Sequence, residues 1–172
     1  AQRHAVAEYI GEQVYSALVQ EARLSPKPGL VDTVNNGSHK DMNLHTFEQS
    51  AVSLRPFFTQ FVLKGMTTAH LPEKQILAEV RPLGLLAEKA MFKATHGVNT
   101  HKGAIFSFGL VCTAIGRLLI RQEVAQSAVD FDIKLICSLV AQFAQGLTDE
   151  LKYYPDHLPV TAGVRLFRKY GL

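Results

Sequence analysis

An apolar run at residues 104–119, entered through a polar stretch, constrains the fold of this chain more than any other feature. The run is apolar nearly all round a helix of this length, and a helix of that kind is buried in the protein. Gly103, Gly109 and Gly116 supply small surfaces on which a second helix can approach closely. We therefore expect residues 104–119 to form the central buried helix of a bundle.

Apolar residues recur at helical spacing through most of the remaining chain. The second helix contains Pro56 as an internal kink, and Pro82 divides a later stretch into two helices. Thr46 and Gln49 are spaced as a capping box. No alternating strand pattern of useful length appears, so we predict one all-α domain, a single multi-helix bundle over residues 1–172. The predicted helices are 5–23, 44–63, 72–80, 82–94, 104–119, 131–147 and 160–172.

Composition narrows the classes of partner. The chain has 172 residues, is 47% hydrophobic and carries a formal net charge of +3. Lys and Arg are scattered, which argues against nucleic acid and favours small anions. The longest uncharged segments, 103–116 and 135–148, are shorter than a membrane span. Cys112 and Cys137 lie in apolar surroundings without metal-ligand spacing, so we expect buried, reduced thiols and a cytoplasmic protein; a homo-oligomer is allowed but not required.

The polar stretch before the central helix, 94–106, reads ATHGVNTHKGAIF and is the first candidate site. It places hydrogen-bonding side chains next to a helix N-terminus, whose unpaired N–H groups favour an anionic ligand. The alternative is a capped turn between two core helices, in which Thr100 only satisfies backbone donors. The candidate ligand-binding residues are Asn99, Thr100, His101, Lys102 and Gly103.

A second loop, 34–42, repeats the same chemistry. Ser38, His39 and Lys40 follow the order of Thr100, His101 and Lys102, and each group precedes a predicted helix. Asp41 comes directly after Lys40. We predict that the two His-Lys motifs converge on one polyphosphate.

Two further charged residues are candidates. Lys27 stands between two prolines, which reduces the entropy cost of presenting its ammonium group, although a lone Lys is more often a solvated charge. Glu88 lies beside the apolar stripe of residues 83–94, along a flank with Gly84 and Thr95. This placement makes Glu88 a candidate ligand for a metal or a hydroxyl group.

Four blocks of sequence follow one another in a recognisable order. They are SPKPGLVD (25–32), GSHKDM (37–42), RPLGLLAEKAMFKAT (81–95) and GVNTHKGAIFSFGL (97–110). Together these blocks resemble the triphosphoribosyl-dephospho-CoA synthase family, most strongly over residues 21–119. The resemblance implies an all-α, cytoplasmic enzyme that transfers the triphosphoribosyl group of ATP to 3′-dephospho-CoA with release of adenine, for the prosthetic group of citrate lyase or malonate decarboxylase. Family members continue past the YGL of residues 170–172, so we expect the front part of a longer enzyme.

The reaction implied by this resemblance lets us assign roles from chemistry. Cationic and polar groups would hold the triphosphate, carboxylates would hold Mg²⁺ against it, and a base and an acid would serve the attacking hydroxyl and the departing adenine. Two alternatives stay open: a helical metal-dependent phosphohydrolase and an inactive nucleotide-binding fragment. The assignments are Lys27, Ser38, Lys40, Asn99, Thr100, Lys102 and Gly103 for the nucleotide, Asp32, Asp41 and Glu88 for the metal, and His39, His101 and Glu88 for catalysis.

Overall fold

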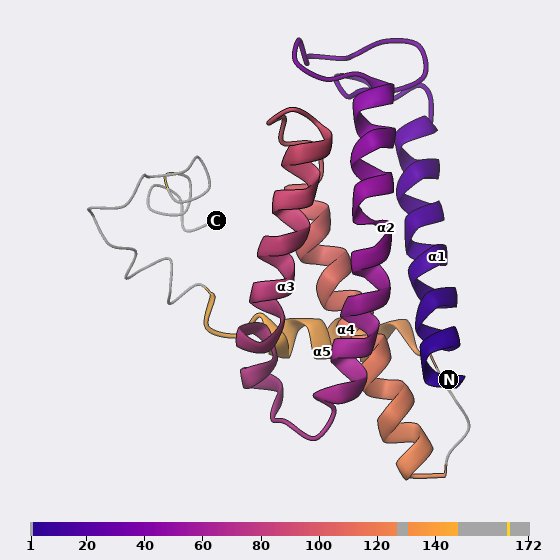
Figure 1. Cartoon of the computed structure of the whole chain (residues 1–172), viewed down its shortest axis with the longest axis vertical. Helices are drawn as coiled ribbons and strands as arrows, with labels where there is room; N and C mark the ends of the chain where they lie inside the picture. The colour runs from indigo at the N-terminus through magenta and orange to yellow at the C-terminus, as the bar shows by residue number, and fades with distance from the viewer. Residues whose placement is uncertain (1, 127–130, 148–164, 166–172) are drawn as a thin grey trace.

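The computed structural model describes residues 2–126, 131–147 and 165. Within these ranges the chain is helical, with no strand, which confirms the all-α prediction. The first four helices run alternately up and down, and α5 lies crosswise to them in the half of the bundle away from the α1–α2 loop (Figure 1). The helices are α1 (Gln2–Arg23), α2 (Leu44–Thr67), α3 (Glu73–Ala94), α4 (Lys102–Val124) and α5 (Ile133–Phe143).

The core forms where α2 packs against α1, α3 and α4. Glycines let α2 and α4 cross with their backbones in contact: a Cβ on Gly116 would lie 2.0 Å from the Val62 carbonyl oxygen, and one on Gly65 would lie 2.0 Å from that of Thr113. A Cβ on Gly109 would lie 2.9 Å from the Phe61 ring. The packing role predicted for Gly109 and Gly116 is therefore confirmed.

The central helix, α4, begins two residues earlier and ends five residues later than expected. Lys102 and Gly103 consequently belong to its first turn. The close-packing role predicted for Gly103 is wrong, because no atom of the described residues lies within 4 Å of a Cβ added there. In the described part of the chain, α4 is the helix whose length and hydropathy would suit a membrane span. It packs against α1, α2, α3 and α5, and its apolar window is half buried within the bundle.

One buried cation anchors α4 at the α5 end. The Arg117 side chain is fully buried, and its Nη1 donates to the Thr68 carbonyl oxygen at 2.8 Å. Its Nη2 donates to the Leu71 carbonyl oxygen and, at 3.2 Å, to Glu73 Oε1. The guanidinium also stands 6.0 Å from the centre of the Phe143 ring. Arg117 thus joins the α2–α3 turn to α4 and α5.

The prediction that Pro82 separates two helices is wrong, because α3 continues through it. Proline removes one backbone hydrogen bond from a helix interior. The apolar stripe nevertheless runs across it without a break: Ile76 and Val80 before Pro82, and Ala87 and Met91 after it, are all buried. Burial of this continuous stripe outweighs the lost hydrogen bond.

Two smaller predictions are also corrected. The capping box of α2 is formed by Asn43 and Thr46, not by Thr46 and Gln49: Asn43 Oδ1 accepts from Thr46 N at 3.0 Å, and Thr46 Oγ1 accepts from Asn43 N at 3.3 Å. Asn is a stronger N-cap residue than Thr, so Asn43 caps the helix at its predicted start, Leu44. Cys112 is buried as expected, and burial raises the pKa of its thiol to about 12, but Cys137 is exposed on α5. The helix predicted at 160–172 lies, except for residue 165, outside the described residues.

Candidate functional site

The two loops that carry His-Lys motifs lie at the same end of the bundle. Figure 1 shows the α1–α2 loop and the α3–α4 loop both at the end where α2 begins. Arg23, the last residue of α1, donates to Glu48 of α2 at 2.8 Å. Thr100 of the α3–α4 loop donates to Ser50, half a turn further along α2, at 2.6 Å. The first two turns of α2 therefore contact the elements on both sides.

Asp32 organises the α1–α2 loop from within. Its carboxylate is buried and accepts hydrogen bonds from the backbone N–H groups of Val34 at 2.7 Å, Lys27 at 2.9 Å and Asn35 at 2.9 Å. Ser25 Oγ adds a fourth at 3.3 Å. These donors, the Lys27 amide foremost, lower the pKa of Asp32 to about 2. Because four donors already occupy this carboxylate, its position fits a loop anchor better than a metal ligand.

The same loop is closed by a contact between two glycines. Gly37 has a positive φ of 56°, and an added Cβ would lie 2.5 Å from the Gly29 carbonyl oxygen. Next to this contact, Lys27 Nζ donates to the backbone oxygen of Glu21 at 2.9 Å and to its carboxylate at 3.1 Å. Only 14% of the Lys27 side chain is exposed. Lys27 therefore joins this loop to α1, and its charge is already partly neutralised.

The rest of the first motif faces solvent. Ser38, Lys40 and Asp41 are exposed, and His39 is half-buried. His39 Nδ1 stands 4.0 Å from Asp41 Oδ1, an ion pair only when the imidazole is protonated. These side chains are accessible to a ligand at this end of the bundle.

The second motif has one buried and one exposed half. His101 is 5% exposed, and its Nδ1 lies 2.7 Å from Ser50 Oγ. Its backbone N–H points at Met91 Sδ at 3.2 Å, and the Phe47 ring meets the imidazole edge-on at a centroid distance of 4.9 Å. A chain of hydrogen bonds thus runs from Thr100 through Ser50 to His101. The Thr100 hydroxyl is committed to this chain.

Burial controls the ionisation of His101. Desolvation lowers its pKa to about 4, with Glu21 acting in the opposite direction and Lys27 in the same one. The imidazole is therefore neutral at neutral pH. Its Nε2 is buried without a hydrogen-bond partner in the described part of the chain. Charge on this ring would be costly in such a setting.

The exposed half is the first turn of α4. Asn99 Oδ1 accepts from the Lys102 N–H at 3.2 Å, and His101 supplies no side-chain cap. The next two amides, of Gly103 and Ala104, have no hydrogen-bond acceptor within the described ranges. Beside them, Lys102 Nζ donates to Glu88 Oε1 of α3 at 2.9 Å. Free amides at the positive end of a 23-residue helix, with an ammonium group next to them, suit an anion.

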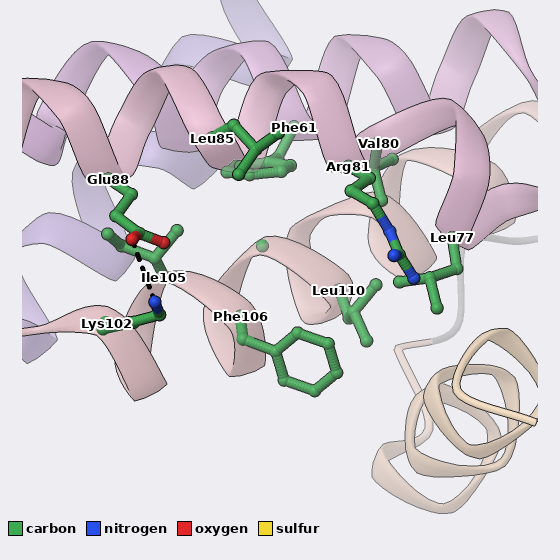
Figure 2. Close-up of a pocket in the computed structure, with 12 residues that line it drawn as sticks. Phe61, Leu77, Val80, Arg81, Leu85, Glu88, Lys102, Ile105, Phe106 and Leu110 are labelled. Carbon is green, nitrogen blue, oxygen red and sulfur yellow. Dashed lines mark hydrogen bonds and ion pairs between the residues drawn. The ribbon is translucent and has the colours of Figure 1, made fainter. Parts of the chain in front are cut away.

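A groove between α3 and α4 opens beside this helix start (Figure 2). Glu88 and Lys102 stand together at one end of it, and Arg81 lies toward the other end. Between them the walls are apolar, and the groove has a volume of about 180 Å³. Gly84 also lines it, on the same side of α3 as Glu88. The other lining residues are Phe61, Leu77, Val80, Leu85, Ile105, Phe106, Gly109 and Leu110.

The structure sorts the predicted residues into three groups. Glu88 and Lys102 meet at the mouth of the groove, and Asn99 and Gly103 flank Lys102 at the start of α4. Ser38, His39, Lys40 and Asp41 lie on the neighbouring loop, and Lys27, Asp32, Thr100 and His101 are engaged in internal contacts. No group of three or more His, Cys, Asp or Glu side chains in the described ranges is arranged to hold a metal by itself.

Sequence reasoning missed Ser50. Its hydroxyl is fully buried and holds both Thr100 and His101. Ser50 falls on the apolar stripe of α2, three residues after Phe47 and four before Leu54. A polar residue at such a position needs a buried partner, and that signal was available in the sequence.

Comparisons with a family model and with curated proteins relate the chain to known sequences. A family model described as "CitG: ATP:dephospho-CoA triphosphoribosyl transferase" matches residues 7–171. The chain is 83% identical to "Protein CitXG" of Haemophilus influenzae, over 100% of this chain and 37% of that protein. It is 58% identical to the 2-(5''-triphosphoribosyl)-3'-dephosphocoenzyme-A synthase of Haemophilus ducreyi, over 99% of this chain and 55% of that protein.

A more distant relative gives the same result. The probable 2-(5''-triphosphoribosyl)-3'-dephosphocoenzyme-A synthase of Vibrio cholerae is 46% identical over 95% of this chain and 50% of its own length. The chain therefore spans from about a third to just over half of the curated relatives it matches. No solved structure gives a significant match to it.

Proposed function

Because the chain belongs to the ATP:dephospho-CoA triphosphoribosyl transferase family, we propose that it works as part of an enzyme that moves the triphosphoribosyl group of ATP onto 3′-dephospho-CoA. A ribose hydroxyl of the acceptor attacks the anomeric carbon of ATP, forming a C–O bond as the C–N bond to adenine breaks. The hydroxyl proton passes to a base, and adenine leaves with a proton from an acid. The product serves as a prosthetic-group precursor, and we place the enzyme in the cytoplasm.

The start of α4 carries this proposal. It offers the amides of Gly103 and Ala104, which have no acceptor among the described residues. Beside them, the Lys102 ammonium group lines a groove large enough for part of a nucleotide. Lys40 and Ser38 stand on the exposed loop at the same end of the bundle and complete the set of phosphate contacts that we propose. Asn99 fixes the first N–H of the helix, which leaves the next two directed at the ligand.

Glu88 and Asp41 are the carboxylates that fit a nucleotide-bound Mg²⁺. Each is accessible to a ligand: the Glu88 side chain is 25% exposed and that of Asp41 63%. Mg²⁺ commonly uses one or two carboxylates together with phosphate oxygens, so two such groups suffice. The ion would neutralise charge on the triphosphate.

The candidate acid and base groups differ in access. Glu88 stands at the groove beside Lys102, and His39 stands on the exposed loop, so these two can exchange protons with bound substrate. His101 is neutral at neutral pH but enclosed, with Nδ1 held by Ser50. We assign it a positioning role, through the loop that leads into α4.

The activity is tested by incubating the chain with ATP, Mg²⁺ and 3′-dephospho-CoA and analysing the products by chromatography. Free adenine and a triphosphoribosylated acceptor are expected. Release of ADP or inorganic phosphate without adenine would contradict the proposal and favour a phosphohydrolase. Tight binding of ATP without any product would favour a nucleotide-binding fragment.

The phosphate site is tested separately, by measuring ATP affinity by calorimetry in two lysine variants. We expect Lys102→Ala to weaken binding at least about tenfold, because it removes a charge-assisted hydrogen bond. Lys134→Ala, at the exposed start of α5, is the matched control and should leave affinity unchanged. Equal affinities in the two variants would remove Lys102 from the phosphate site.

A further inference from the structure

The groove between α3 and α4 has the size of a single ring system. Its volume is about 180 Å³, whereas an engineered apolar cavity of roughly 150 Å³ binds benzene. A whole nucleotide or coenzyme would not fit in it. The groove therefore suits one planar heterocycle, with the remainder of the ligand outside.

The walls suit an aromatic ligand. Figure 2 shows Leu85 and Phe61 on one side of the groove and Phe106 on the other. Leu85 and Phe106 are 62% and 45% exposed, although both are apolar, so the groove is open to solvent between them. Gly84 contributes no side chain to the wall, and in the part of the chain that the structure describes nothing lies within 4 Å of the Cβ that another residue would place there. Aromatic and aliphatic walls of this kind stabilise a flat ring by stacking and by burial of apolar surface.

The polar end of the groove favours one kind of ring substituent over another. Glu88 uses Oε1 to accept from Lys102, and no hydrogen bond to its Oε2 is recorded within the described ranges. A carboxylate oxygen only accepts hydrogen bonds, so it favours an amino group on a ring edge and disfavours a carbonyl there. Adenine presents a 6-amino group, whereas a 6-oxo purine presents an oxygen.

From these three observations we propose that the α3–α4 groove is an adenine subsite, with Glu88 accepting from the 6-amino group and Lys102 next to the triphosphate. Asp41 is then left as the carboxylate for nucleotide-bound Mg²⁺ and His39 as the acid–base group. The inference rests on the proposed function, because both ATP and 3′-dephospho-CoA carry adenine. The start of α4 would then hold phosphates while the adjacent groove holds the base. The groove has room for the adenine of either substrate.

The first test fills the groove with an added side chain. Gly84→Leu places a side chain in the open space, and the substitution also suits a helix. We expect the affinity for adenosine to fall at least about tenfold, whereas that for inorganic tripolyphosphate stays unchanged. Ala17→Leu, on the exposed face of α1, is the matched control and should change neither. Circular dichroism checks that both variants are folded.

The second test leaves the packing intact. The wild-type chain should bind adenosine at least about tenfold more tightly than inosine, and Glu88→Gln should lose this preference because an amide can also donate. Titrating ATP and 3′-dephospho-CoA into Gly84→Leu then identifies the source of the base, since only the substrate whose adenine enters the groove should lose affinity.

The outcomes separate this inference from the phosphate site. If the wild-type chain binds no adenosine, or if Gly84→Leu binds it as well as the wild type, the adenine subsite is refuted even when tripolyphosphate binds. If adenosine binding depends on Gly84 but tripolyphosphate does not bind, the subsite is supported and the proposed phosphate contacts are wrong.

Discussion

At the scale of single residues, the buried contacts of Ser50 determine the orientation of the second His-Lys motif, residues 100–102. Ser50 Oγ accepts from Thr100 and lies 2.7 Å from His101 Nδ1, so one hydroxyl on α2 orders two consecutive residues of the α3–α4 loop. The next residue, Lys102, is then delivered to the surface at the start of α4. Alternation between buried and exposed positions thus places the cation beside the groove.

The lowered pKa of His101 predicts acid sensitivity. Its pKa falls from 6.5 in the unfolded chain to about 4 in the fold. The unfolded state therefore binds more protons between these values, and stability falls as pH drops from about 6.5 towards 4, by up to about 3 kcal/mol. Urea unfolding at pH 7.5 and 5 measures this loss. The loss of stability between these two pH values should be smaller in His101→Gln than in the wild type. Equal pH dependence in both proteins would contradict the lowered pKa of His101.

Asp32 gives a prediction that separates a loop anchor from a metal ligand. Asp32→Ala removes the acceptor of three backbone N–H groups. We expect a lower Tm both with and without Mg²⁺, by the same amount, because the lost contacts are internal. Asp41→Ala, on the exposed part of the same loop, is the control and should leave the Tm unchanged without Mg²⁺. A Tm loss for Asp32→Ala that appears only with Mg²⁺ and ATP would instead indicate a metal role.

The residue types of the site could be predicted from sequence, but their burial could not. The position of Lys102 and Gly103 before an apolar helix correctly indicated a helix N-terminus. Nothing in the loop itself indicated that His101 would turn inward, since that depends on Ser50 and Phe47, about fifty residues earlier. The occupied carboxylate of Asp32 likewise depends on loop folding rather than on residue type.

At the scale of helices, the crossing of α2 and α4 depends on Gly65 and Gly116. Gly116→Ala would place a Cβ 2.0 Å from the Val62 carbonyl oxygen, a backbone atom that cannot move independently. We expect a loss of about 2 kcal/mol or more in the free energy of unfolding, measured by chemical denaturation. Gly84→Ala meets no atom of the described ranges within 4 Å and should instead stabilise α3, by roughly 0.5–1 kcal/mol. Similar effects of the two substitutions would contradict this account.

Helix identity was easier to predict than helix ends. The periodic apolar stripes located α1 to α5, because each stripe is buried against a neighbour. The continuation of α3 through Pro82 was not predictable from local rules, since the local cost of proline is outweighed by burial of Val80 and Ala87 on either side. The Asn43 cap was overlooked although Asn is among the strongest N-cap residues.

At the scale of the whole molecule, Arg117 fixes the end of the bundle opposite the loops. Arg117→Met leaves the carbonyl oxygens of Thr68 and Leu71 without this donor, and we expect a loss of about 3 kcal/mol in the free energy of unfolding. Arg121→Met removes only a partly exposed ion pair with Glu73 and should cost less than about 1 kcal/mol. Equal costs in denaturant titrations would show that the buried contacts contribute little.

The alternating course of the first four helices has a consequence for ligand sensing. Glu48 and Ser50 of α2 touch α1 and the α3–α4 loop respectively, so the beginning of α2 is shared by both sides of the proposed phosphate site. A polyphosphate bound by both loops would suppress local opening at the beginning of α2, residues 44–50. Amide hydrogen exchange at residues 44–50 should then slow on ATP binding, so the exchange rate of this segment reports whether the phosphate site is occupied.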